Sequence, residues 1–484
     1  MPVALRNVLK WRNGHDAATQ AARQRSAPHV NASWVFVCVM VTVLAAHLWV
    51  GLSIPRLQSP DEPDHVRRAY LVAHGEFLLS APENQMSGGW VDSEFDAYLA
   101  AYHALSLPQH PGERVSQEWV NEQAAREWSG QRTRYAILPG TGFYFPLIYA
   151  PQALGILVGE LTGQTIEASY RLAQFAALLT SLVLVFVAFR LWAMPPAAGA
   201  LLLMPMSVFQ VVSASIDGVA NGLLLVVVTT FLSAWQNPRQ RHHAAMLGVL
   251  CVGIFVVVTC RYQLAGLLLL PFALAWRRRS WAWAALGLTV LAATLAWVGF
   301  AMATIVDNRV DIGADTATIL AYYVTAPLEF AKVFYRSWAD PELRALYYES
   351  FFGRLAATDV RYTDLQYRLM AALVLLITAL SIERAQWRAN WQARAVLAVC
   401  AVAAVPLTFL AMVLAWTPHP AFVVYGVQGR YFIGPALLLI YALSRHDRGL
   451  RSRRVALAWV LVLVVGVFSV VTIPQLMAER FYGG

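Results

Sequence analysis

Long apolar runs separated by short polar segments occupy most of the chain after residue 33. The first run, residues 34–54, is about 20 residues long, which is enough to cross the hydrocarbon core of a bilayer and too long for a typical signal peptide. No small-residue cleavage motif follows it. We therefore expect an uncleaved first transmembrane helix, followed by further spans from the later apolar runs.

Clusters of arginine between the runs predict how the chain threads through the membrane, because cytoplasmic loops are enriched in Lys and Arg. The segment before Trp34 is basic, which predicts a cytoplasmic N-terminus. Four later clusters have the same character: Arg239 and Arg241; Arg277, Arg278 and Arg279; Arg384, Arg388 and Arg394; Arg445, Arg448, Arg451, Arg453 and Arg454. If all are cytoplasmic, eleven spans are expected: 34–54, 171–191, 197–216, 218–235, 245–259, 264–276, 281–303, 369–382, 395–416, 431–444 and 455–474.

This threading predicts an all-α integral membrane protein with two large extracytoplasmic loops, 55–170 and 304–368. The transmembrane domain covers residues 34–474, between a basic cytoplasmic tail, 1–33, and an extracytoplasmic tail, 475–484. The apolar stretch 143–161 then begins and ends outside. Because tyrosine favours membrane interfaces, Tyr144 and Tyr149 favour an interfacial helix there, with a twelfth full span as the alternative.

Composition supports a membrane protein and argues against a soluble domain or a nucleic-acid-binding protein. Hydrophobic residues make up 58% of the 484 residues and charged residues only 13%, against about 25% in soluble domains. The net charge of +9 comes from the arginine clusters, so it indicates membrane orientation and not a nucleic-acid partner. Residues 55–142 have instead a net negative charge, because they contain twelve acids and seven arginines. The four cysteines (Cys38, Cys251, Cys260 and Cys400) lack CxxC spacing and are typical of buried apolar positions.

The first candidate site is the segment Ser59-Pro60-Asp61-Glu62-Pro63-Asp64-His65 at the start of the first loop. Ser59 suits a helix N-cap and Glu62 completes a capping box, so Glu62 has a structural explanation as good as a catalytic one. Capping does not require Asp61, which shares a helix face with His65 at i, i+4. Acids beside a histidine predict a general base, or a divalent cation site (Mg or Mn) with Asp61, His65 and Asp217 as ligands.

Three further charged residues stand among apolar neighbours at the predicted outer surface. Asp217 lies at the outer end of two spans, where an acid usually faces protein or a water-filled cavity, although it could also simply end the helices. Arg261, followed by Tyr262, and Arg430, preceded by Gln428, lie opposite the arginine clusters. A guanidinium pairs well with a phosphate, so these residues predict a lipid-phosphate site; the alternative is snorkelling to lipid headgroups.

Four sequence segments resemble a widespread bacterial family of polytopic membrane proteins long catalogued as a domain of unknown function. They are SPDEPDH followed by RAYLVAHGEF, YFPLIYAPQALG, LMPMSVFQVVSASID and VQGRYFIGPALLL, in the family's order. That family is in turn similar to the GT-C glycosyltransferases. The resemblance implies a GT-C-like fold whose outer loops contain interfacial helices.

Enzymes of the GT-C class take a sugar from a polyprenyl-phosphate carrier at the outer side of the membrane. The resemblance implies that Asp61, with Glu62 as its rival, is the general base, and that Asp217 is a second site acid. Arg261 and Arg430 would bind the donor phosphate, with Tyr262 and Gln428 beside them. Many GT-C enzymes carry lysine where Arg261 stands, and the proline that often follows is here Tyr262.

The sequence therefore predicts an inverting glycosyltransferase of the bacterial inner membrane, with membrane lipids around it and a glycan, lipid or protein as acceptor. A transporter or flippase of a lipid-linked saccharide is the alternative, because it also needs phosphate-binding arginines. Transporters usually place ionisable groups at mid-membrane and contain repeats. Here the predicted site charges gather at one face and the loops are large, which favours the enzyme. A non-catalytic partner in envelope assembly is a third possibility.

Overall fold

The computed structural model describes residues 32–105, 114–236, 243–382, 390–444 and 453–483, divided into two compact units, 1–46 and 47–484. The described part of the first unit is the beginning of one helix, α2 (Ala32–Ser53), which ends in the second unit. Most of the predicted basic tail lies outside the described residues, as do one whole arginine cluster, Arg239 and Arg241, and parts of two others: Arg384 and Arg388; Arg445, Arg448 and Arg451.

The second unit is built from helices, many of them apolar. Six helices of the described chain are long and apolar enough to cross a membrane: α8 (Ile166–Leu191), α11 (Asp217–Gln236), α14 (Trp281–Thr304), α18 (Asp364–Ser381), α20 (Trp391–Ala415) and α22 (Arg453–Phe481). Shorter apolar helices include α12 (His243–Cys260) and α21 (Ile433–Leu443). The predicted helical integral membrane protein is confirmed, whereas the count of eleven spans stays a prediction.

One predicted span, 197–216, is interrupted. It consists of α9 (Pro196–Leu203) and α10 (Pro205–Val211), separated by an extended Met204 at φ −68° and ψ 156°. Proline disfavours helical backbone in the residue before it, and Pro205 accounts for the break. The predicted span 264–276 is likewise a 3₁₀ turn, η2 (Tyr262–Leu268), followed by α13 (Leu269–Arg278).

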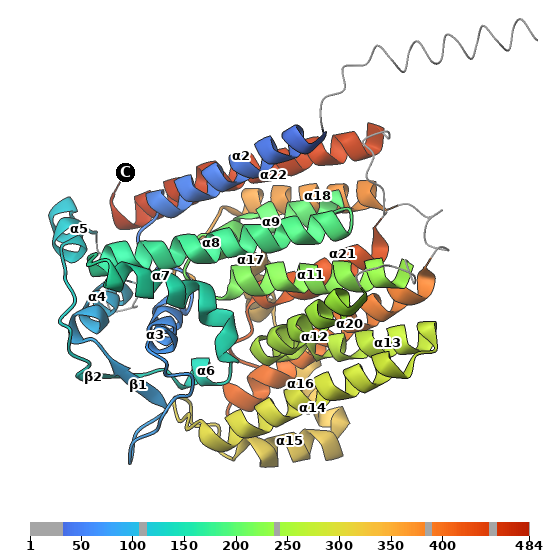
Figure 1. Cartoon of the computed structure of the whole chain (residues 1–484), viewed down its shortest axis with the longest axis horizontal. Helices are drawn as coiled ribbons and strands as arrows, with labels where there is room; N and C mark the ends of the chain where they lie inside the picture. Colours follow the sequence, from blue (N-terminus) through green and yellow to red (C-terminus); the bar gives the residue numbers. More distant parts are fainter. Residues whose placement is uncertain (1–31, 106–113, 237–242, 383–389, 445–452, 484) are drawn as a thin grey trace, which may run out of the picture. The chain divides into compact units, whose positions relative to one another are not determined.

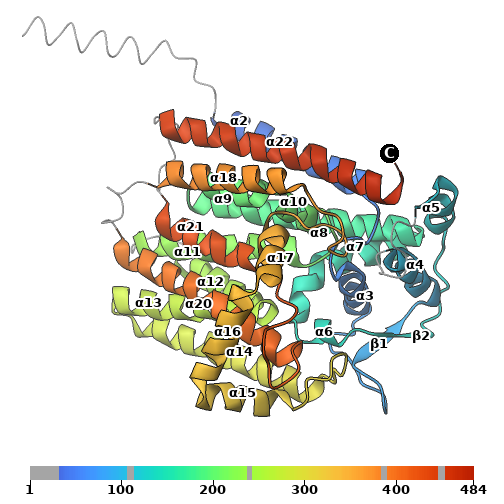
Figure 2. The ribbon, with the colours of Figure 1, turned by 180° about the vertical axis from the view of Figure 1, so that it is seen from behind.

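The helices place basic and acidic segments at opposite ends of the second unit. The end of α13 and the residue that follows it carry Arg277, Arg278 and Arg279, and the connection from α13 to α14 lies at the right-hand end in Figure 1. The first loop lies at the left-hand end, and Figure 2 shows the same separation from behind. This separation is the one that the positive-inside pattern predicts.

The first loop folds into short elements at that left-hand end: α3 (Glu62–Ala73), β1 (Gly88–Val91), α4 (Ser93–Ala104), α5 (Gln117–Ala124), β2 (Arg134–Ile137), α6 (Pro139–Gly142), η1 (Pro146–Tyr149) and α7 (Ala150–Leu161). The sequence analysis did not predict the antiparallel pair β1–β2. Its register pairs Trp90 with Tyr135, whose rings meet edge to face with centroids 5.4 Å apart. Aromatic cross-strand pairs of this kind stabilise short sheets.

The predicted interfacial helix at 143–161 takes a different form. Helix α7 has 12 residues, about 18 Å at 1.5 Å per residue, which is too short to cross a bilayer. It packs antiparallel along α8, because Gly155 lies against Ala173 and Gly159 against Ser169. Tyr149 is fully buried. The stretch therefore forms a hairpin with α8 in which Tyr149 is an interior residue, while its place at the membrane interface stays a prediction.

The second loop covers one side of α20 with three helices, α15 (Thr316–Thr325), α16 (Pro327–Ala339) and α17 (Pro341–Phe352). A second apolar core lies between them and α20, where Tyr347, Phe409 and Phe432 pack together. Many aromatics of this loop are thus structural. Helix α22 continues to Phe481, so the predicted tail 475–484 is mostly helical.

The α7–α8 contact yields a stability prediction. A Cβ atom on Gly155 would lie 2.4 Å from the Ala173 backbone, whereas one on Gly248, in α12, would meet no atom within 4 Å. We expect Gly155→Ala to destabilise the protein by roughly 1–3 kcal/mol, because backbone atoms cannot move aside easily. Gly248→Ala should be neutral or stabilising, since alanine favours helix. Thermal melting of both purified variants tests this, and equal melting temperatures would contradict the close packing.

Candidate functional site

Asp61 begins helix α3 in an unusual backbone conformation. Its φ of 61° and ψ of 5° lie in the left-handed region, which aspartate and asparagine adopt more readily than most residues with a side chain. Within the described residues, its carboxylate makes no capping hydrogen bond. The predicted cap was therefore wrong: the helix starts at Glu62, two residues later than expected, and Ser59 is not its N-cap. The Asp61 carboxylate is left to face other groups, and its side chain is 64% exposed.

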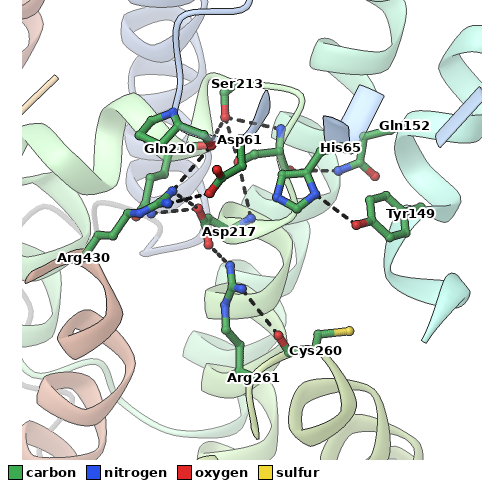
Figure 3. A network of polar contacts seen from close by, with 12 residues as sticks. Asp61, His65, Tyr149, Gln152, Gln210, Ser213, Asp217, Cys260, Arg261 and Arg430 are labelled. Carbon is green, nitrogen blue, oxygen red and sulfur yellow. Dashed lines mark hydrogen bonds and ion pairs between the residues drawn. The ribbon is translucent and has the colours of Figure 1, made fainter. Parts of the chain in front are cut away.

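Four predicted site residues form one chain of alternating charges (Figure 3). Arg430 Nη2 donates to Asp61 Oδ2 at 2.6 Å, and Arg430 Nη1 lies 3.5 Å from Asp217 Oδ2. Arg261 forms an ion pair with the other oxygen of Asp217. Asp61 and Arg430 are 369 residues apart in sequence, so these ion pairs join the first loop to the ends of three apolar helices. We call these four residues the charge chain.

Asp217 is held at the start of α11 by the loop that precedes it. Three side chains from three helices bind the backbone of this loop: Glu62 accepts from Ala214 N at 2.7 Å, Gln152 donates to Ser215 O at 2.9 Å, and Gln174 donates to Val212 O at 2.5 Å. Asp217 itself accepts from Gln210 Nε2 at 2.8 Å. Its side chain is 9% exposed, so the carboxylate is fixed inside the protein.

Arg430 is held by the second loop. It lies in a 3₁₀ turn, η3 (Gly429–Phe432), just before α21. Gly429 N donates to Ser350 Oγ of α17 at 2.6 Å, and a Cβ atom on Gly429 would lie 1.9 Å from Tyr347 O. Only glycine allows this close approach, which anchors the arginine backbone. The Arg430 side chain is 4% exposed.

His65 contacts the charge chain from the next turn of α3. Its Nδ1 lies 2.9 Å from Tyr149 Oη, and its ring stacks on Tyr144 with centroids 6.1 Å apart. Burial lowers the pKa of His65 to about 3; the Asp61 carboxylate opposes this, whereas the Arg261 and Arg430 guanidiniums add to it. The imidazole is therefore neutral near pH 7 and adds no charge to the site.

Glu62 and Asp61 are neighbours with different environments. Glu62 is buried, and its two oxygens accept from Ser59 N, Tyr170 Oη and Ala214 N at 3.1, 2.9 and 2.7 Å. Burial raises the pKa of Glu62, although the three donors oppose this. Partial loss of hydration among the neighbouring protein groups would also raise the pKa of Asp61, but the Arg430 guanidinium outweighs this effect and the pKa falls below its ordinary value. Glu62 is thus a structural bridge, and Asp61 is an exposed carboxylate.

The remaining predicted residues surround the charge chain. Tyr262 Oη donates to Phe143 O at 2.6 Å, so its hydroxyl is bound to the backbone. Gln428 is partly exposed, two residues before Arg430. The sequence analysis missed Gln210, Ser350 and the role of Tyr149 in binding His65. Nothing in the spacing of these polar residues distinguishes them from ordinary buried ones.

The geometry does not fit the predicted metal site. Asp61 and Asp217 each face Arg430, so a guanidinium occupies the space between the two carboxylates. The described residues contain no group of three or more His, Cys, Asp or Glu side chains that could hold a metal ion. The arrangement fits an anion better, because two arginines converge on one region beside an exposed carboxylate.

Comparison with known proteins adds one finding. The model of a family described as "Predicted membrane protein (DUF2142)" matches residues 43–440, which include the four residues of the charge chain. No curated protein matches the chain.

The structural role of Glu62 predicts a loss of stability on substitution. In Glu62→Gln, an amide NH₂ would face a hydrogen-bond donor, so we expect a loss of at least about 2 kcal/mol. Asp64→Asn is the matched control, because Asp64 is an acid of the same helix, 37% exposed, with one ion pair to Arg67 at 3.2 Å. That variant should change stability by less than about 1 kcal/mol. Thermal melting measures both, and equal losses would refute the bridge.

The neutral state of His65 predicts a pH dependence of stability. With its pKa lowered from 6.5 to about 3, only the unfolded chain binds a proton between these values. His65 therefore destabilises the fold as pH falls below 6.5, by roughly 2 kcal/mol at pH 5. We expect the melting temperature of His65→Gln to fall less between pH 7.5 and 5 than that of wild type. His103→Gln, at an exposed position, should behave as wild type does; identical slopes for all three proteins would show that His65 is not buried in its neutral form.

Proposed function

The chain belongs to the DUF2142 family of predicted membrane proteins, and from this premise we propose that it is an inverting glycosyltransferase that uses a polyprenyl-phosphate sugar as donor. The observation that carries the proposal is the ion pair between an exposed carboxylate, Asp61, and a buried arginine, Arg430, with Arg261 in the same charge chain. The resemblance of the family to GT-C glycosyltransferases supports it.

The proposed reaction uses these residues as follows. Asp61 takes the proton of an acceptor hydroxyl, whose oxygen attacks the anomeric carbon of the sugar and forms the new glycosidic bond. The bond from that carbon to the phosphate oxygen breaks, and its electron pair goes to the phosphate. Arg430 and Arg261 stabilise the negative charge that develops there. His65, being neutral, donates or accepts hydrogen bonds without competing for the proton.

The site is proposed to lie on the extracytoplasmic side of a bacterial inner membrane, with the N-terminus in the cytoplasm. Support comes from the arginine-bearing turn at 277–279, which is at the opposite end of the helices from α3 and β1 (Figure 2). The proposed acceptor is an envelope glycan, lipid or protein. The donor would enter from the surrounding lipid, because its polyprenyl tail is apolar.

A transporter or flippase of the same lipid-linked sugar is the second candidate. Transporters usually hold ionisable groups near the middle of the membrane, in interrupted helices. Asp217, at the start of α11, and Arg261, at the end of α12, stand at helix ends instead. This favours the enzyme, although the interrupted α9–α10 pair is a feature that a transporter could share.

Substitution of the proposed base gives the central test of function. Asp61→Asn keeps the shape of the side chain and removes the base, so sugar transfer should fall by about 10²–10⁴-fold. A deletion strain should accumulate one polyprenyl-phosphate sugar, detected by mass spectrometry of lipid extracts. Wild type should clear it, and a normally inserted Asp61→Asn should not. Asp64→Asn, the control, should clear it.

Three other outcomes would change the assignment. If Asp61→Asn clears the donor as well as wild type, Asp61 is not the base. If no polyprenyl-phosphate sugar changes in the deletion strain, the donor class is wrong. A sugar lipid that accumulates only on the cytoplasmic face would favour the transporter.

A further inference from the structure

We infer that Arg430 serves both the base and the donor. Before the donor binds, Arg430 pairs with Asp61 and keeps this carboxylate from acting as a base. When the donor binds, its phosphate replaces Asp61 on Arg430 and so releases Asp61. This inference rests on the proposed function. It makes donor binding a condition for base activity, so that the enzyme binds its donor before it activates an acceptor.

The two ends of the ion pair differ in how firmly they are held. The Arg430 side chain is 4% exposed and its backbone is anchored against α17, whereas the Asp61 side chain is 64% exposed. Asp217, the other acid beside Arg430, is 9% exposed and bound by Gln210 and Arg261. An incoming anion can therefore displace Asp61 more easily than either Asp217 or the arginine itself.

Arg430 also has donor capacity left over. Its buried Nε has no hydrogen-bond partner among the described residues, and its Nη1 lies at a long 3.5 Å from both Pro60 O and Asp217 Oδ2. The bond from this guanidinium to Asp61 is short, at 2.6 Å. A phosphate with several oxygens can use more of these donors than a carboxylate does. Exchange of partners is thus favourable for the arginine.

The charges of the site balance before and after the proposed reaction. The charge chain has two arginines and two acids, which sum to zero. A phosphodiester donor brings one negative charge. During transfer, the acceptor proton neutralises Asp61 while the departing phosphate gains one negative charge, so the site total stays constant. Since both groups that change charge are partners of Arg430, one buried arginine can compensate each of them in turn during the transfer step.

Competition predicts that removal of the base strengthens donor binding. Asp61→Asn should bind a polyprenyl phosphate about tenfold more tightly than wild type, equivalent to ~1.4 kcal/mol, while it loses sugar transfer. Full-length protein in lipid nanodiscs is titrated with undecaprenyl phosphate, and binding is followed by native mass spectrometry. Inorganic phosphate forms a parallel arm, which separates recognition of a lipid-linked phosphate from recognition of any phosphate ion.

Matched variants separate competition from simple charge removal. Asp64→Asn removes the same charge three residues away without contacting Arg430, and should leave binding within about twofold of wild type. In an Arg430→Gln background, Asp61→Asn should give no gain, because the shared partner is gone. Arg430→Lys serves as a second background if the glutamine variant fails to fold. The comparison of Asp61→Asn with Asp64→Asn decides the inference even if neither background folds.

The possible failures can be told apart. If wild type binds undecaprenyl phosphate and Asp61→Asn binds no more tightly, or if Asp64→Asn gains as much, the shared-arginine inference is overturned and the proposed function stands. If wild type binds no polyprenyl phosphate, the donor assignment falls and the inference falls with it. Binding of inorganic phosphate with equal affinity would replace the lipid-linked donor with a soluble one.

Discussion

The structure where the first loop meets the helix ends depends on one constraint: charges surrounded by apolar residues must be paired. A single arginine or aspartate in such surroundings costs several kcal/mol, and removing one partner of a buried pair is more costly than replacing both. The charge chain meets this constraint with alternating signs, from Asp61 through Arg430 and Asp217 to Arg261. Its members come from the first loop and from three separate apolar helices, so the pairing also fixes how these segments meet.

The residues around the charge chain hold it in place largely through backbone contacts. Asp217 is placed by the preceding loop, and Glu62, Gln152 and Gln174 bind the backbone of that loop. The two oxygens of Asp217 are in turn bound by Gln210 and Arg261. Arg430 is placed by a backbone contact between Gly429 and Ser350, so its guanidinium stays available for Asp61 or for a ligand. Preorganisation of this kind, in which binding groups are fixed by a surrounding shell, is what anion recognition requires.

The sequence predicted the parts of this site better than their arrangement. Asp217, Arg261 and Arg430 stood out because a charge among apolar residues is costly. Asp61 stood out because capping does not require it and it shares a helix face with His65. The predicted topology placed all four at one end. The ion pairs between them could not be predicted, since they depend on tertiary contacts over hundreds of residues. Local signals misled twice: Ser59 resembles a helix cap although the helix begins at Glu62, and Tyr149 resembles an interface anchor although it binds His65 in the interior. In both cases tertiary contacts overrode a local preference.

The adjacent acids Asp61 and Glu62 show why sequence alone left the base undecided. Both are carboxylates at the predicted start of one helix, where capping explains Glu62 but does not require Asp61. The backbone separates them, because the left-handed conformation of Asp61 turns its side chain away from the helix while Glu62 follows the regular helical course into the interior. A group that is fully bound by three donors cannot take a proton from a substrate without losing them, whereas a carboxylate with a single guanidinium partner can. The number of hydrogen-bond partners therefore distinguishes the two acids. Glu62 has three and is structural, whereas Asp61 can exchange its guanidinium partner and is the better candidate for a base.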